Sequence, residues 1–154
     1  MIYFLSSEIS FLFFFPFFFF FIKFSLTGHT NKLYTVKASY DTTRAVTGSY
    51  DRTIKIWDLN KGNATKTLTH TSTANDLCFL DEASHTIISG HFDGSLRLWD
   101  IRSGETVKEL SNICQSQITS LSPFSEKRRV LINSKDNNLK VLDLRMFEVV
   151  QTYS

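Results

Sequence analysis

Short stretches of alternating apolar and polar residues, separated by turn-forming residues, fill the chain from residue 24 onward. Alternation at every second position is typical of a half-buried β-strand, and closely spaced turns indicate an all-β fold. Ile54 and Ile56, for example, fall on one face of the predicted strand 53–57. Strands are predicted at 32–38, 45–49, 53–57 and 65–69, then at 74–79, 86–90, 95–99 and 106–110, and finally at 118–122, 129–133, 139–142 and 149–153.

One segment of this pattern recurs along the chain. Residues 47–58 read TGSYDRTIKIWD, and residues 89–100 read SGHFDGSLRLWD. Residues 132–143 form a degenerate third copy, INSKDNNLKVLD. A period of about 40–45 residues that ends in Trp-Asp is the sequence mark of β-propeller blades. These endings, Trp57-Asp58 and Trp99-Asp100, resemble the WD40 repeat family, and the resemblance implies a binding scaffold.

The repeats predict an all-β, partial WD40 propeller built from four-stranded blades. Three blades are expected, at about 28–69, 70–110 and 111–154, and residues 23–29 align with 66–70 as the orphan outer strand of a preceding blade. Closed propellers use about four to eight blades. We therefore expect residues 24–154 to be part of a longer, seven-bladed domain.

Residues 1–23 form a Phe-rich, low-complexity segment, since eleven of the fifteen Phe residues lie within the first 24 positions. Its uninterrupted apolar part, residues 11–22, is shorter than the roughly 20 residues that a membrane-spanning helix needs. The segment also lacks the basic start and the small-residue cleavage site of a signal peptide. Because Phe codons are rich in thymine, we interpret the run as a translated pyrimidine tract, a gene-model artefact. A hydrophobic anchor is the alternative.

Composition and motifs narrow the function classes. A formal net charge of +2 gives no reason to expect nucleic acid as a partner. Cys78 and Cys114 lie outside any metal-ligand spacing and are interpreted as reduced thiols of an intracellular protein. The sequence has no Gly-rich phosphate loop, metal-ligand cluster or nucleophile elbow. We therefore expect no enzyme activity, no cofactor and no metal.

The WD40 resemblance assigns a structural tetrad of a His, a hydroxyl residue, an Asp and a Trp to each blade. Buried polar groups of this kind need hydrogen-bond partners, and a complete network makes a blade rigid. A hydrolase would also use a His, a hydroxyl and an Asp, but an active site is built once rather than in every blade. His85 and His91 are assigned to surface or turn positions. The tetrad positions are His29, Thr47, Asp51 and Trp57 in the first blade, His70, Ser89, Asp93 and Trp99 in the second, and only Asp136 in the third, where Ile132 and Leu142 replace the hydroxyl and the Trp.

Particular segments resemble one subfamily more than WD40 repeats in general. Residues 26–29 (LTGH), 51–59 (DRTIKIWDL), 89–93 (SGHFD), 99–103 (WDIRS) and 139–145 (LKVLDLR) together resemble the C-terminal propeller of the autophagy-related protein 16-like family, over about residues 24–154. The resemblance implies a scaffold in autophagosome assembly that directs attachment of a ubiquitin-like modifier to phosphatidylethanolamine. The family's conjugation-binding N-terminal region and coiled coil are not recognised in this sequence. We therefore expect the chain to supply part of a partner-docking propeller.

The implied partners are proteins, namely the autophagy conjugation complex and its adaptors. The implied location is cytoplasmic and peripheral to autophagosomal precursor membranes, which the chain would contact only through partners unless the Phe run is a true anchor. The alternative function is a WD40 adaptor of another pathway, such as a ubiquitin-ligase substrate receptor or a signalling scaffold. A small membrane-anchored protein that uses the Phe run is a third possibility.

WD40 domains commonly bind partners on the face that carries the loops between outer and inner strands. Exposed aromatic residues such as Tyr50 and Phe92 often anchor interfaces. The alternative is that both pack on neighbouring loops. By position within the repeat, this docking face is predicted to display Lys32, Tyr34 and Tyr50 from the first blade, Thr73, Asn75 and Phe92 from the second, and Gln117, Thr119 and Lys135 from the third.

Overall fold

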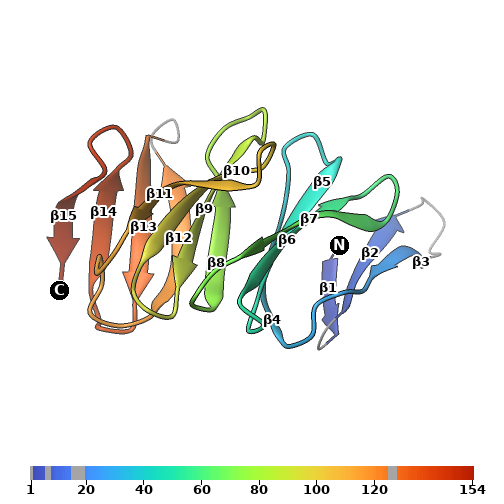
Figure 1. The fold of residues 1–154 in the computed structure, drawn as a ribbon, viewed down its shortest axis with the longest axis horizontal. Coiled ribbons are helices and arrows are strands. Elements are labelled where there is room, and N and C mark those ends of the chain that lie inside the picture. The colour runs from blue at the N-terminus through green and yellow to red at the C-terminus, as the bar shows by residue number, and fades with distance from the viewer. Residues whose placement is uncertain (1, 6–7, 15–19, 125–127) are drawn as a thin grey trace.

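The computed structural model describes residues 2–5, 8–14, 20–124 and 128–154, and within these ranges it describes side chains from residue 25 onward. The regular elements in the described ranges are all β-strands. Three four-stranded antiparallel sheets, here called blades 1 to 3, follow one another along the molecule (Figure 1). The all-β, partial propeller predicted from the sequence is therefore confirmed.

Each blade takes its four strands in chain order, and each strand pairs with the next. Blade 1 contains β4 (Leu33–Ala38), β5 (Arg44–Ser49), β6 (Thr53–Asp58) and β7 (Asn63–Thr69). Blade 2 contains β8 (Ala74–Phe79), β9 (Thr86–His91), β10 (Leu96–Asp100) and β11 (Glu105–Leu110). Blade 3 contains β12 (Ile118–Phe124), β13 (Arg129–Ser134), β14 (Leu139–Asp143) and β15 (Glu148–Tyr153).

The Asp of each Trp-Asp or Leu-Asp ending stabilises the turn that follows the third strand. Asp58 accepts a hydrogen bond from the backbone N–H of Asn60 at 2.8 Å. Asp100 and Asp143 accept the equivalent bond from the residue two positions on, at 2.7 Å and 2.8 Å. An Asp side chain bonded to the backbone in this way favours a turn over a longer strand. The repeated Asp therefore sets the point where the third strand of each blade ends.

Neighbouring blades pack through a shared apolar core and one close backbone approach. One buried cluster joins Ile54 and Ile56 of blade 1 to Leu77 and Ile87 of blade 2. A second cluster joins blades 2 and 3 in the same way. Glycines stand where the first strand of the next blade passes. A Cβ built on Gly48 would lie 2.9 Å from the Ala74 carbonyl oxygen, and one on Gly90 would lie 2.5 Å from Cγ2 of Ile118.

The strand predicted at the start of the repeat region is present as β3 (Phe20–Leu26). It pairs with β2 (Glu8–Phe14), which pairs with β1 (Ile2–Leu5), so that a three-stranded sheet lies beside blade 1 (Figure 1). Leu26, at the end of β3, is buried against Ala45 and Trp57 of blade 1. β3 thus contacts blade 1 as the outer strand of a preceding blade would.

The interpretation of residues 1–23 as an artefact or an anchor stays a prediction, and residues 1, 6–7 and 15–19 lie outside the described residues. Among the residues described, no helix has the length and apolar character that crossing a membrane would require.

Candidate functional site

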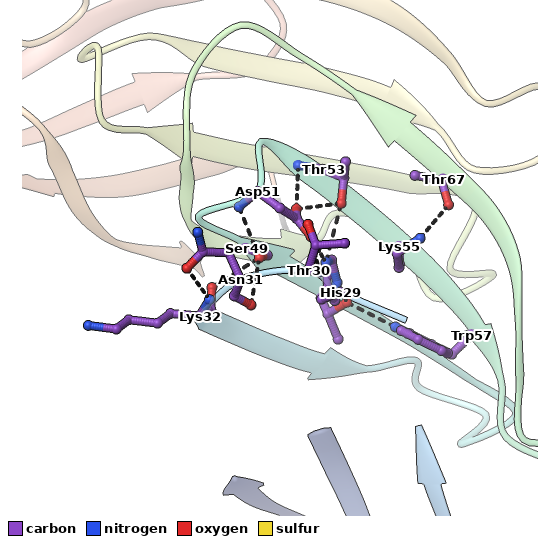
Figure 2. A network of polar contacts seen from close by, with 11 residues as sticks. His29, Thr30, Asn31, Lys32, Ser49, Asp51, Thr53, Lys55, Trp57 and Thr67 are labelled. Carbon is purple, nitrogen blue, oxygen red and sulfur yellow. Dashed lines mark hydrogen bonds and ion pairs between the residues drawn. The ribbon is translucent and has the colours of Figure 1, made fainter. Parts of the chain in front are cut away.

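The four tetrad residues of blade 1 form one continuous hydrogen-bonded chain, and Figure 2 labels three of them, His29, Asp51 and Trp57. The Trp57 indole Nε1 donates to Oγ1 of Thr47 at 2.9 Å, and Thr47 Oγ1 lies 2.6 Å from Nε2 of His29. The other ring nitrogen of His29, Nδ1, lies 2.8 Å from the carboxylate of Asp51. A carboxylate only accepts, so Nδ1 carries the proton and Nε2 accepts from the Thr47 hydroxyl. The chain of donors therefore runs from Trp57 to Thr47 to His29 to Asp51.

The protonation of this chain follows from burial and pairing. Burial lowers the pKa of His29, and the hydrogen bond to Asp51 only partly opposes that effect. Burial raises the pKa of Asp51, but hydrogen bonds from Thr53, His29 and the Thr30 backbone outweigh it and lower the pKa to about 2. At neutral pH the network thus contains a neutral imidazole and a carboxylate. Thr47 is fully buried and its oxygen is already engaged by Trp57, so it is placed to hold the blade together and not to attack a substrate.

Blade 2 builds its network from a different histidine than the sequence predicts. Trp99 Nε1 donates to Oγ of Ser89 at 2.8 Å, and Ser89 Oγ lies 2.7 Å from Nε2 of His91. His91 Nδ1 donates to the Ser72 carbonyl oxygen at 3.2 Å. His91 is fully buried, so its assignment to a surface or turn position is wrong. The assignment of His70 to this network is also wrong, because neither of its buried ring nitrogens has a hydrogen-bond partner.

Arg97, and not His70, pairs with the Asp93 carboxylate. It stands on β10 where blade 1 has Lys55, which points away to the Thr67 hydroxyl (Figure 2). Arg97 instead turns inward, and its Nη2 lies 3.1 Å from the Asp93 carboxylate and 2.7 Å from the carboxylate of Glu109. The Asp93 carboxylate is therefore engaged by a guanidinium, where Asp51 is engaged by a histidine.

Blade 3 keeps only the aspartate, as predicted from its worn repeat. Asp136 accepts hydrogen bonds from the Ser134 hydroxyl and from the Asn138 and Gln115 backbone N–H groups. Ile132 and Leu142 stand at the hydroxyl and Trp positions, and both are fully buried in the apolar cluster. Apolar packing thus replaces the hydrogen-bonded chain in this blade.

The predicted docking residues lie around the β5–β6, β9–β10 and β13–β14 turns. The same backbone bond recurs in each blade: the N–H groups of Tyr50, Phe92 and Lys135 donate to the carbonyls of residues 32, 73 and 117 at 2.9, 2.9 and 3.0 Å. Tyr50 and Phe92 are 52% and 60% exposed, which argues against both packing on neighbouring loops. Lys32, Tyr34, Thr119 and Lys135 are exposed as well. Each blade therefore presents the corresponding turn in the same way.

Two hollows lie along this surface, one on each side of Phe92. The Tyr50–Phe92 groove encloses about 270 Å³ and is lined by those two residues and by Arg52, Thr71, Ser72 and Thr73. The Phe92–Lys135 groove encloses about 550 Å³ and is lined by Phe92, Gln115, Ser116, Gln117 and Lys135. Among the described residues, no group of three or more His, Cys, Asp or Glu side chains is placed to hold a metal ion.

Two predicted docking residues are less available than expected. Thr73 is only 8% exposed, although it lines the Tyr50–Phe92 groove. Asn75 donates its side-chain amide to the Ile118 carbonyl at 2.9 Å, so it links blades 2 and 3. Sequence reasoning missed Arg52, Ser72 and Gln115 as groove residues. Their only sequence signal was adjacency to the repeated turns.

Comparison with known proteins places this architecture in a family. The family model "WD domain, G-beta repeat" (WD40) matches residues 21–58 and 62–100, which together are half of the chain. The chain is 44% identical over 131 residues to Protein tipD of Dictyostelium discoideum, and 41% identical over 132 residues to Autophagy-related protein 16 of Arabidopsis thaliana. A shorter match, 44% over 46 residues, is to eukaryotic translation initiation factor 3 subunit I of Caenorhabditis elegans, and it covers 30% of the chain and 14% of that protein.

The first two matches cover 84% and 85% of the chain but only 21% and 26% of the relatives. The chain therefore corresponds to about a quarter or less of those proteins. The repeats, the four-stranded blades and the matched family model agree with one another. The chain belongs to the WD40 repeat family.

Proposed function

We propose that this chain is the docking part of a non-catalytic autophagy scaffold that acts in autophagosome assembly. The observation that carries the proposal is the similarity to Autophagy-related protein 16 of Arabidopsis thaliana across 85% of the chain. WD40 domains typically bind proteins, and members of the family generally act as scaffolds. In the proposed role, the complete protein directs lipid conjugation of a ubiquitin-like modifier, and this chain binds the conjugation complex or its adaptors.

The surface chemistry supports protein docking as the activity of this part. Tyr50 and Phe92 border a hollow and expose more than half of their surface, which is the situation of an aromatic interface anchor. Tyr34 lies beside Tyr50, with ring centroids 6.2 Å apart, and extends the aromatic surface. A protein partner would bury these rings without any chemical step.

The rigid blade cores give this surface a fixed shape. Buried hydrogen-bonded chains stand directly behind the turns that carry Tyr50 and Phe92. The turn backbones are themselves bonded to residues 32 and 73. Because little order has to be gained on binding, more of the contact energy is available for affinity. In the proposed scaffold, the chain works in the cytoplasm and reaches precursor membranes through its partners.

The test is a double substitution, Tyr50→Ala with Phe92→Ala, in the complete polypeptide expressed in cells that lack the endogenous protein. We expect reduced recovery of conjugation-complex proteins or adaptors in a pull-down, and less lipid-conjugated modifier. Tyr40→Ala is the matched control, because Tyr40 is 53% exposed but lies in the β4–β5 turn, at the opposite end of the blade. Thermal unfolding should be similar for the double variant and the control.

Two results would contradict the proposal in different ways. Unchanged partner recovery in the double variant would mean that the docking face is elsewhere. Loss of a partner from another pathway, with normal levels of lipid-conjugated modifier, would favour a WD40 adaptor such as a ubiquitin-ligase substrate receptor or a signalling scaffold.

A further inference from the structure

A cluster of buried polar atoms without partners lies inside blade 2. In the part of the chain that the structure describes, the buried side-chain nitrogens or oxygens that lack a hydrogen bond are Nδ1 and Nε2 of His70 and Nη1 of Arg97. Buried polar groups normally find partners, so a cluster of exceptions requires an explanation. These atoms belong to neither the hydrogen-bonded chain of the blade nor the exposed docking surface.

His70 is held by ring contacts in place of hydrogen bonds. Its ring lies edge-on to His91, with centroids 4.5 Å apart, and 6.1 Å from the Trp99 ring. The charged groups that act on it are Arg97 on β10, Asp93 in the β9–β10 turn and Asp51 in the β5–β6 turn. Glu109 on β11 pairs with Arg97 from the other side. A proton added to His70 would therefore create a second buried cation beside Arg97.

The groove wall is attached to this histidine pair. Residues 71–73 follow His70 directly and line the Tyr50–Phe92 groove. The His91 ring donates to the Ser72 carbonyl at 3.2 Å, and the Asp93 N–H donates to the Ser72 hydroxyl at 3.1 Å. The wall of the groove thus depends on the position of the His91 ring and of the turn beside it.

We propose that His70 and His91 form a proton-responsive pair, which holds residues 71–73 in place while both rings are neutral and releases them when a ring is protonated. His91 already donates through Nδ1, so a second proton would sit on Nε2 and face the hydroxyl hydrogen that Ser89 now directs there. The backbone of Ser72 is the acceptor within reach of a proton on His70, but its carbonyl oxygen already accepts from His91 Nδ1. The His91 bond to the Ser72 carbonyl would persist in the protonated ring. The closed segment is therefore destabilised by a buried positive charge next to Arg97 and not by the loss of that bond.

The direction of the pH effect follows from the difference in pKa of each ring between the closed and the opened segment. Burial lowers the pKa of His70 to about 4, and burial together with the nearby His70 ring lowers the pKa of His91 to about 3. In an opened segment each ring would return to an ordinary pKa of about 6.5. The open form then binds more protons than the closed form below that pH. By linkage, each histidine raises the opening constant ~30-fold at pH 5 relative to neutral pH.

The histidine pair would act on the Tyr50–Phe92 groove, so the inference rests on the proposed docking function. Its test, however, needs no partner protein. Hydrogen exchange on the full chain at pH 7.5 and pH 5.0, corrected for the intrinsic exchange rate, reports opening at the Phe92 and Asp93 amides, which bond to Thr73 and Ser72. We expect protection there to fall at least ~30-fold on acidification, while amides of β13, in the blade whose sequence contains no histidine, change much less.

His70→Gln separates the pair from general acid sensitivity. Because His70 makes no hydrogen bond through its ring, this variant should fold, and its loss of protection at pH 5.0 should be ~30-fold smaller than in the wild type. His85→Gln is the matched control, since His85 lies in a turn of the same blade outside the cluster, and it should behave as the wild type. An equal loss of protection in His70→Gln and the wild type, or an equal loss across all blades, would overturn the proposal. Either result would leave the docking function itself to its own test.

Discussion

The carboxylate of Asp76, on β8 of blade 2, accepts a hydrogen bond from the Thr35 hydroxyl on β4 of blade 1, at 2.8 Å. Its second oxygen accepts from the Leu121 backbone N–H on β12 of blade 3, also at 2.8 Å. Lys37 of blade 1 lies 3.4 Å from the same carboxylate. Asp76 is only 8% exposed, so one buried side chain ties the first strands of all three blades together.

Removal of this carboxylate should weaken the contact between blades. Asp76→Ala leaves the Thr35 hydroxyl and the Leu121 N–H without partners, and each buried unsatisfied group costs about 1–3 kcal/mol. We expect a loss of roughly 2–5 kcal/mol in the free energy of unfolding, measured by urea denaturation. Thr35→Val, which removes one of the two bonds, should cost clearly less. Equal losses in the two variants would show that the Leu121 bond contributes nothing.

The hydroxyl group of Thr47 should contribute more to stability than the volume of its side chain. Thr47→Val keeps the shape of the side chain but leaves the Trp57 N–H and His29 Nε2 without partners in a fully buried site. A cost of about 2–4 kcal/mol is expected from two unsatisfied groups. Thr69→Val, at an exposed position of β7, is the control and should stay within about 0.5 kcal/mol of the wild type. A small effect of Thr47→Val would mean that the network adds little to stability.

The two histidines of blade 2 should respond in opposite directions to an apolar replacement. His70→Phe removes two buried nitrogens that have no partners, so we expect unfolding free energy to stay the same or to rise by up to about 1 kcal/mol. His91→Phe breaks the bonds to Ser89 and Ser72 and should cost about 2–4 kcal/mol. The order of the two midpoints in urea is the result that checks this prediction. A lower midpoint for His70→Phe than for His91→Phe would mean that His70 is the histidine of the blade 2 network.

The repeat period was sufficient to predict the blades but not every partner inside them. All twelve predicted strands of blades 1 to 3 are present with bounds within two residues, because apolar alternation and turn residues act locally. Equivalent positions also brought His29 and Asp51 together correctly in space. In blade 2 the same rule failed, since the outcome depends on Arg97 competing for Asp93 across the sheet. The replacement of Lys55 by Arg97 at one repeat position was the available signal, because Arg favours paired carboxylates more than Lys does.

Asp76 shows a different limit of sequence reasoning. An acidic residue within the apolar strand 74–79 can be recognised as unusual in the sequence. Its partners, Thr35 and the Leu121 backbone, lie 41 and 45 residues away and become neighbours only through the packing of separate blades. A period identifies equivalent positions in each blade, but it does not state which positions of different blades touch. The docking surface has the same property, since each groove lies between two blades.

Gly90 should tolerate no side chain, because β12 passes directly over it. A Cβ at this position would lie 2.5 Å from Cγ2 of Ile118, so Gly90→Ala requires the two blades to move apart. Such overpacking typically costs about 1–3 kcal/mol, and urea denaturation should show a loss in that range. Asn133→Gly is the control at the equivalent position of blade 3, where the residue is exposed. A loss in Gly90→Ala no larger than in the control would mean that the blades adjust at little cost.

Stability should fall as the pH drops from about 6.5 toward 4. Burial lowers the pKa values of His29, His70 and His91, the latter two to about 4 and about 3, so these rings stay neutral in the folded chain. The unfolded chain, with ordinary histidine pKa values near 6.5, binds more protons in this window, and stability is therefore lost as the pH falls. Each such histidine contributes a slope of at most about 1.4 kcal/mol per pH unit.

Asp51 should add a second loss at lower pH. Because hydrogen bonds lower its folded pKa to about 2, its contribution is present above an ordinary carboxyl pKa of about 4 and disappears as the pH falls toward 2. Urea midpoints measured between pH 8 and pH 3 should thus decline in two stages. His70→Gln should flatten only the first stage, and Asp51→Asn only the second. A midpoint that stays constant from pH 7 to pH 4.5 would contradict the burial of neutral histidines in these blades.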